Sequence, residues 1–441
     1  MSPVHSEMAK ATRSLETVRN AKKYLPSFYN RGGQRDALAW CMHAVPTELL
    51  LSFDIECEWP ENFGALCAAR LVATTFIDIA GQEGYSSELC SYLTTSTGYC
   101  SRCAELGEVP PESPLAEGMG VPGMLLGSTW FCEPRYKWLQ AMSTRYFPVP
   151  VFCTDPLSPP YDADIHDPRV AEHYRSYLLD ELKALVVFLE EQTGKRLDVD
   201  RFRRAMEISQ ESLKYWYETL ELRKARPCPM GSEDYFTCII AQLYMPGKEE
   251  ALDFFQRVHG EVEERVKKGI GVIPDEKYRL HFAGIPPWYN LGLFNYLETK
   301  GAIGVFESTY YPGPPVEIDL DDPLQGLVQR IWKKACWSHG SGAEAVPEMS
   351  NPGTQQVVGR EFLIQSVRDW GVDGAIMHRT RSCRAVSWGQ THYRNILERE
   401  GIPTILFESD MADPRNWSDS RVKAMIEPFI ETLHELKEGK A

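Results

Sequence analysis

The sequence predicts an α/β protein with two parallel-sheet units, an N-terminal helical segment and a central helical layer. Three observations favour this fold: short apolar runs that alternate with helical patterns, a long central stretch with helical periodicity, and one internal repeat. The chain has 441 residues, of which 43% are hydrophobic and 25% are charged. A chain of this length and composition can form two or three domains with separate cores.

Residues 1–59 form the predicted helical segment, which ends in the run VPTELLLSFD. Residues 60–166 form the first predicted α/β domain. It begins with a long apolar helix over 62–81, which is followed by two strand candidates, GMLLGSTWF and PVPVFCTD. Short buried strands that alternate with helices are typical of parallel sheets.

Residues 167–265 form the predicted connecting layer, because apolar residues recur there at helical spacing and Gly194 separates two long helical patterns. Residues 266–441 form the second predicted α/β domain. Its four strand candidates are KYRLHFAGIPPWYN, GAIGVFESTYY, GVDGAIMHRTRSC and IPTILFESD, and a helix over 420–439 closes the chain. Ligands of such sheets bind at the carboxyl ends of the strands.

One pattern occurs in both predicted α/β domains. Cys132 lies nine residues after the first glycine of GMLLGSTWFC, and Cys383 lies nine residues after that of GAIMHRTRSC. A helical stretch and a Pro-led strand that ends in aspartate follow each cysteine, and these aspartates are Asp155 and Asp410. The repeat predicts two similar halves, each with a cysteine at a strand's carboxyl end.

Composition excludes several classes of protein. The net charge of −15 argues against nucleic acid or an anionic membrane surface as a partner. The N-terminus lacks the apolar core of a signal peptide and no later run has membrane-spanning length, so we expect a cytoplasmic protein. The sequence contains no phosphate-loop lysine motif, so we do not expect it to bind ATP.

Twelve cysteines in a reducing compartment do not indicate disulfides. We expect four of them to be interior packing residues: Cys41, Cys67, Cys153 and Cys238. Structural zinc sites are typically built from two close cysteine pairs, and the chain has only one such pair, in GYCSRC.

The repeat makes Cys132 and Cys383 candidate metal ligands, and Cys90 is a further candidate. Cys90 follows the long apolar helix and can approach the strand ends of the first unit. Three thiolates on an iron cluster with one open position suit substrate chemistry. The residues alone leave an alternative open, in which Cys90 and Cys132 are interior residues and Cys383 is a surface thiol.

Several segments together resemble one family. They are VPTELLLSFD, SSELCSYLTTSTG, STWFCEPRYKWLQ, IPPWYNLGLFNYLE, DGAIMHRTRSCRAVSWGQ and FESDMADPRNWSDSR. In order and spacing they resemble the family that joins 2-hydroxyacyl-CoA dehydratases with ATP-dependent, class I benzoyl-CoA reductases. The resemblance implies two flavodoxin-like or Rossmann-like units. It also implies an iron–sulfur cluster, 4Fe-4S or double-cubane, on Cys90, Cys132 and Cys383.

MHRTRSCRAVSWGQ and IPPWYNLGLFNYLE look closest to the larger catalytic subunit of benzoyl-CoA reductases. The implied reaction is the two-electron dearomatisation of benzoyl-CoA, or another aryl-CoA, to cyclohexa-1,5-diene-1-carbonyl-CoA. The implied partners are a second homologous cluster-binding subunit, an ATP-hydrolysing activator and ferredoxin. The alternatives are an (R)-2-hydroxyacyl-CoA dehydratase subunit, a double-cubane cluster reductase and a supporting subunit without a cluster.

Glu48 resembles an acidic position of the family near the cluster and is the candidate catalytic acid; the alternative is a helix-capping carboxylate. Glu56 and His43 are weaker candidates. Trp288, Tyr289 and Tyr310, together with Tyr311, are expected to wall an aromatic substrate or to be core residues.

Three arginines flank Cys383, and they are expected to bind CoA phosphates or an acidic partner surface: Arg379, Arg381 and Arg384. Ser338 and His339 lie in a Gly/Pro-rich segment that predicts a lid, a subunit contact or a plain surface loop.

Overall fold

The computed structural model describes residue 8 and residues 10–33, 37–130, 132–155, 164, 167–340 and 360–439. Two four-stranded sheets dominate it, and every strand pairing in them is parallel. The first sheet has the order β2-β1-β3-β4, with β1 (Leu38–Cys41), β2 (Glu56–Glu58), β3 (Met124–Ser128) and β4 (Val151–Thr154). The second has the order β6-β5-β7-β8, with β5 (Tyr278–Ala283), β6 (Ala302–Glu307), β7 (Gly374–Thr380) and β8 (Thr404–Ser409). The predicted α/β fold with two parallel-sheet units is confirmed.

The first sheet takes two strands from the segment that was predicted to be wholly helical. That prediction was wrong at β1 and β2, which flank the short helix α4 (Thr47–Leu51). All four residues of β1 are buried. A strand buried on both faces shows no alternation of polar and apolar residues, so periodicity cannot separate it from a helix. Three short helices do precede it: α1 (Glu16–Arg19), α2 (Ala21–Tyr24) and α3 (Pro26–Tyr29).

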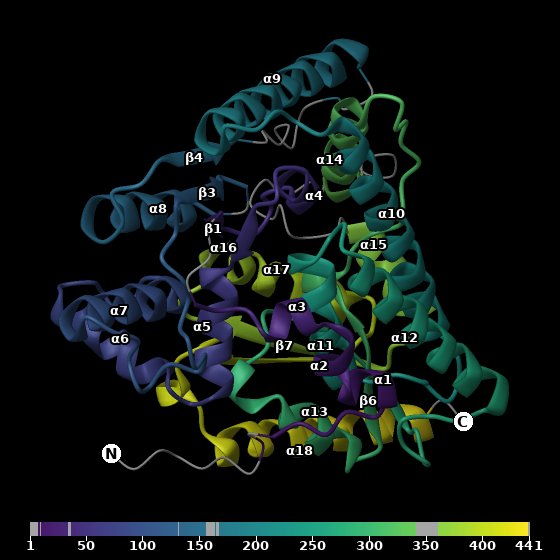
Figure 1. The fold of residues 1–441 in the computed structure, drawn as a ribbon. Coiled ribbons are helices and arrows are strands. Elements are labelled where there is room, and N and C mark those ends of the chain that lie inside the picture. Colours follow the sequence, from purple (N-terminus) through teal and green to yellow (C-terminus); the bar gives the residue numbers. More distant parts are fainter. Residues whose placement is uncertain are drawn as a thin grey trace.

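Helices cover both faces of the first sheet, on the left of the view in Figure 1. Trp40 and Leu125 point to one face, where they share a core with α5 (Pro60–Ala69), α6 (Ala73–Gln82), α7 (Ser91–Leu106) and α8 (Pro134–Arg145). Ala39 and Leu126, the next residues along the strands, point to the opposite face. That face packs on α4, α9 (Pro168–Thr193), α10 (Val199–Leu222) and α14 (Pro323–Gly340).

The long helix predicted over 62–81 is two helices, α5 and α6. The helical pattern is interrupted at Leu71, whose backbone is left-handed with φ of 59°. A leucine in this conformation ends the run of helical hydrogen bonds, since an L-residue cannot continue a right-handed helix with positive φ.

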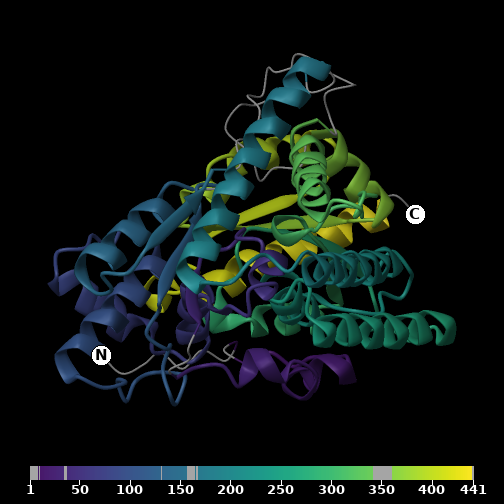
Figure 2. The ribbon, with the colours of Figure 1, turned by 45° about the horizontal axis from the view of Figure 1, so that its top comes forward.

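The predicted central layer consists of α9, α10, α11 (Ser232–Tyr244) and α12 (Glu249–Lys268). Gly194 ends α9 with φ of 67°, as predicted, and Asp198 caps α10 by accepting a hydrogen bond from the Arg201 amide. Figures 1 and 2 both show α10 and α12 running side by side.

The second sheet is also covered on both faces. Leu280 and Ile376 face α11, α13 (Gly292–Glu298) and α18 (Asp419–Glu438). Ala375 and Met377 face the opposite way, toward α15 (Arg360–Asp369) and α17 (Gln390–Arg399). The remaining short elements are α16 (Arg384–Ser387), η1 (Trp288–Asn290), η2 (Ser308–Tyr310) and η4 (Pro414–Asn416). No helix within the described ranges has the length and apolar character that a membrane crossing requires.

The two units share more than their strand order. The Leu125 amide of β3 donates to the Pro150 carbonyl before β4, and the Ala375 amide of β7 donates to the Pro403 carbonyl before β8, both at 2.9 Å. The cysteine loops therefore follow strands that hold the same place in each sheet. This agrees with the repeat predicted from the sequence.

Candidate functional site

Three cysteines from separate loops line one cavity of about 410 Å³. Cys90 is the N-cap of α7, Cys383 is the N-cap of α16 beyond β7, and Cys132 lies between β3 and α8. The strand ends of both units thus supply one thiol each, and the helices between β2 and β3 supply the third. The structure brings together the three cysteines that were predicted as metal ligands.

The thiols are close enough to influence one another. Burial raises the pKa of Cys90 well above its ordinary value, and the Cys383 and Cys132 thiols raise it further. Burial raises the pKa of Cys383 to about 12, with Cys132 and Asp410 adding to the rise. Burial also raises the pKa of Cys132, and the Arg135 guanidinium opposes that rise. In the metal-free protein these thiols are therefore protonated at neutral pH.

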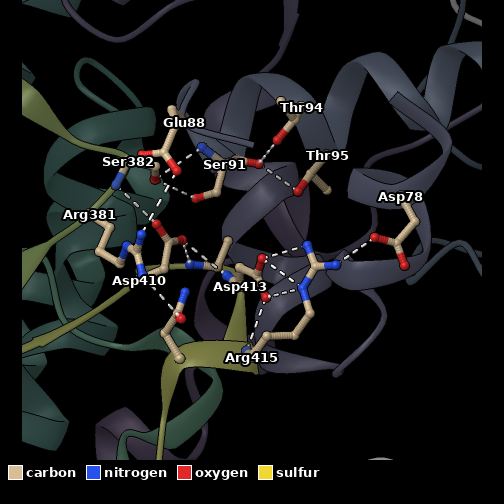
Figure 3. Close-up of polar contacts among 12 residues, drawn as sticks. Asp78, Glu88, Ser91, Thr94, Thr95, Arg381, Ser382, Asp410, Asp413 and Arg415 are labelled. Atoms are coloured by element: carbon tan, nitrogen blue, oxygen red, sulfur yellow. Dashed lines mark hydrogen bonds and ion pairs between the residues drawn. The ribbon is translucent and has the colours of Figure 1, made fainter. Parts of the chain in front are cut away.

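Two serines beside these cysteines join their loops (Figure 3). The Ser91 amide donates to the Ser382 hydroxyl at 3.2 Å, and that hydroxyl donates to the Ser91 hydroxyl at 3.1 Å. Ser91 directly follows Cys90, and Ser382 directly precedes Cys383. Both serines are buried. Two loops 291 positions apart are thus held in a fixed relation.

A buried ion pair lies beside Cys132. Arg135 contacts one Glu61 carboxylate oxygen through Nε at 3.0 Å and Nη2 at 2.9 Å, and it donates to the Trp130 carbonyl at 2.7 Å. The other Glu61 oxygen accepts the His43 amide at 2.6 Å. Sequence reasoning missed Arg135, although its place three residues after a candidate ligand, in the first turn of a helix, was a usable signal.

The cavity walls are rich in aromatic side chains: Phe28, Tyr29, Tyr92, Trp130, Phe236, Tyr244, Trp288, Tyr310 and Tyr311. Trp288 donates through its indole nitrogen to the Tyr92 hydroxyl, and its ring meets Phe236 edge-on with centroids 6.0 Å apart. The predicted wall residues Trp288 and Tyr310 are therefore at the cavity. Tyr289 is not, because it is buried behind the wall and its hydroxyl donates to the Asp410 carbonyl at 2.8 Å.

Glu48 lies in an adjoining cavity of about 230 Å³, where its carboxylate pairs with Arg330 at 2.7 Å. The two cavities share His43, Trp130, Gln242, Leu243 and Lys334. The shared residues therefore lie between Glu48 and the cavity that the thiols line.

Two of the residues that line both cavities, His43 and Lys334, have lowered pKa values. Burial lowers the pKa of His43 well below its usual value, and the Arg135 and Lys334 charges lower it further, so the imidazole is neutral. Burial, with the Arg330 charge, lowers the pKa of Lys334 to about 8. An amine with this pKa can hold or release a proton near neutral pH.

The predicted arginines lie outside the cavity. The Arg384 side chain is 73% exposed and pairs with Glu133 at 3.2 Å. Arg381 pairs with Glu88 at 3.8 Å (Figure 3) and with Glu408 at 3.9 Å. They form a surface beside Cys383 and do not line the site.

Arg379 and Glu56 do not line the cavity. Arg379 donates to Thr391, and Glu56 is exposed on β2. Ser338 and His339 fall in the last turn of α14, and positions 341–359 of the predicted lid lie outside the described residues.

The spacing of the thiols does not suit a single metal ion. Within the described ranges, no three His, Cys, Asp or Glu side chains are grouped for one metal ion. In a cubane each thiolate binds a different iron, so the ligands stand further apart than around one ion. Cys90, Cys132 and Cys383 supply the thiol donors that such a cluster takes, and they line one cavity of about 410 Å³.

Comparison with known proteins gives one family match. The family model described as 2-hydroxyglutaryl-CoA dehydratase, D-component, matches residues 42–433. The chain is similar to the (R)-2-hydroxyisocaproyl-CoA dehydratase alpha subunit of Clostridioides difficile, at 26% identity over 95% of each chain. It is also similar to the alpha subunit of lactoyl-CoA dehydratase from Anaerotignum propionicum, at 26% identity over 94% of this chain and 97% of that one. The B subunit of benzoyl-CoA reductase from Thauera aromatica is 26% identical over 89% of this chain and 87% of its own.

Proposed function

Because the chain belongs to the family of the 2-hydroxyglutaryl-CoA dehydratase D-component, we propose that it is the cluster-binding subunit of an enzyme acting on CoA thioesters. Cys90, Cys132 and Cys383 would hold a 4Fe-4S cluster, whose contribution when bound is electron transfer at low potential. The observation that carries the proposal is the convergence of these thiols on one aromatic cavity.

The aromatic walls favour an aryl-CoA as the substrate. Flat rings pack well against Trp288, Tyr310 and Phe236, whose side chains surround the space beside the thiols. Apolar walls also exclude water, which strengthens the electrostatic interactions within the cavity. We infer a two-electron reduction of the ring, with benzoyl-CoA as the simplest substrate and cyclohexa-1,5-diene-1-carbonyl-CoA as the product.

The ring must gain protons as well as electrons. Glu48 remains our candidate for the proton source, although it lies one cavity away from the thiols. Lys334 lines both cavities and has a pKa lowered to about 8, so it can pass a proton from the Glu48 side to the substrate side. His43, which is neutral and lines both cavities, can accept or donate a hydrogen bond along the same route.

Partner subunits follow from the names of the relatives, which are alpha or B subunits of larger enzymes. We propose a second homologous cluster-binding subunit, an ATP-hydrolysing activator and ferredoxin as the electron source. The exposed Arg384 beside Cys383 suits an acidic partner surface.

The second candidate is the dehydration of an (R)-2-hydroxyacyl-CoA, favoured by the dehydratase names of the family and of two relatives. The two reactions differ in electron balance. Ring reduction consumes two electrons in every turnover, whereas dehydration leaves the oxidation state of the substrate unchanged. The amount of product formed per electron supplied therefore distinguishes the two reactions. About one product molecule per two electrons indicates ring reduction, and a much larger yield per electron indicates dehydration.

The test of the site is iron binding by the anaerobically purified protein with its partner subunits. We expect about four irons per chain of this kind, and about eight would indicate a double-cubane cluster instead. C90S, C132S and C383S should each lose iron. C67S and C238S are the matched controls, since Cys67 and Cys238 are buried packing residues, as predicted, and neither lines the cavity. Iron retained in full by all three site variants would refute the proposal.

A further inference from the structure

The aspartate that ends β8 is buried next to the Cys383 loop. Asp410 is 3% exposed. One of its carboxylate oxygens accepts the Ser382 amide at 3.2 Å, and the other accepts the amides of Ala412 at 2.9 Å and Asp413 at 3.0 Å. Three backbone donors hold the carboxylate in one orientation.

The charge of Asp410 has no cationic partner among the described residues. The nearby arginines pair elsewhere. Arg381 pairs with Glu408 and, as Figure 3 shows, with Glu88, and Arg415 pairs with Asp78 and Asp413. A buried charge that no cation neutralises acts strongly on neighbouring groups, because little solvent screens it.

Asp410 also anchors the contact between two ligand loops. Its bond to the Ser382 amide fixes the residue whose hydroxyl bonds to Ser91, and these serines adjoin Cys383 and Cys90. The corresponding aspartate of the first unit differs. Asp155 is only half-buried, and its carboxylate accepts the exposed hydroxyl of Thr129.

We propose that Asp410 is a positioning residue that fixes the Cys383 loop against Cys90 through the two serines and sets a negative charge beside the bound cluster. This inference rests on the proposed function. A fixed negative charge disfavours the addition of an electron, so Asp410 lowers the reduction potential of the site. A low potential is what the reduction of an aromatic ring requires.

The first experiment measures the midpoint potential of the assembled enzyme by electron paramagnetic resonance during a redox titration. D410N removes the charge with little change of shape. We expect its equilibrium constant for one-electron reduction to rise about tenfold, a shift of about 59 mV to more positive potential. D155N, the matched control from the first unit, should shift it by less than half as much. An unchanged potential in D410N would overturn the role of the charge.

The second experiment uses the metal-free protein and therefore does not depend on cluster binding. Dibromobimane links two thiols that lie close together, and the linked Cys90–Cys383 peptides are quantified by mass spectrometry. S382A keeps the Asp410 charge but removes the hydroxyl contact with Ser91. We expect at least a threefold lower yield than in wild type, and an equal yield would overturn the positioning role. If wild type itself binds no iron, the proposed function fails, while this measurement still tests the contact.

Discussion

The buried pair Arg135–Glu61 gives the sharpest stability prediction. R135M removes the cation and leaves the Glu61 carboxylate, whose side chain is 13% exposed, without its partner at 2.9 Å. The Trp130 carbonyl also loses its donor. Breaking a buried ion pair from one side costs about 3–5 kcal/mol, because a charge stays buried without compensation. We expect the free energy of unfolding of the metal-free protein to fall by this amount in urea titrations followed by circular dichroism.

The variant E61Q tests whether loss of the Arg135–Glu61 ion pair causes the fall in stability of R135M. In wild type this change should destabilise the protein, because Arg135 loses its counter-charge. In R135M the same change should stabilise the protein by about 2 kcal/mol, because it removes the stranded charge while the new amide oxygen can still accept the His43 backbone N–H. R145M on the same helix is the control: its pair with Glu83 is half exposed and should cost less than about 1 kcal/mol. If E61Q destabilises both backgrounds equally, the reasoning is wrong.

Three further predictions concern packing, pH and catalysis. G98A should destabilise by about 1–3 kcal/mol in thermal unfolding, because its Cβ would overlap the Phe76 carbonyl where α6 crosses α7, whereas G81A in open space should be neutral or stabilising. The metal-free protein should lose stability as the pH rises from about 9 to about 12, because the unfolded Cys383 thiol ionises while the folded one stays protonated; C383A should flatten this slope, and an identical slope would contradict it. E48Q should lower kcat about 10²–10⁴-fold with little change in KM, and full activity would exclude Glu48 as the acid.

The sequence predicted six of the eight strands, because β3 to β8 follow clear turn signals or glycines and are flanked by helical patterns. It missed β1 and β2, which are three or four residues long and enclose a helix of five. Such short elements bury too few residues to show a period, and only the pairing of β1 with β2 and β3 makes them strands.

The cysteines of the candidate site could be singled out from the sequence, whereas most of the other residues around the cavity could not. Cys132 and Cys383 carry a local signal, since each follows a strand at the same offset. Arg135, Tyr92 and Lys334 reach the cavity from helices whose relative placement is decided by packing of the whole chain. Tyr289, by contrast, was predicted to line the cavity but does not. It is adjacent to Trp288 in sequence, yet it points to the other side of the wall, where its hydroxyl donates to the Asp410 carbonyl.

The repeat explains why the third thiol had to come from elsewhere. Two units of the same topology place one cysteine each at equivalent strand ends, which yields an even number of ligands. A site with three thiolates and one open position must break that symmetry. The chain does so with α5, α6 and α7, which lie between β2 and β3 and carry Cys90 at the start of α7. The Ser91–Ser382 contact then joins this helix to the second unit, so Cys90 is held beside the cysteine loop of the opposite half.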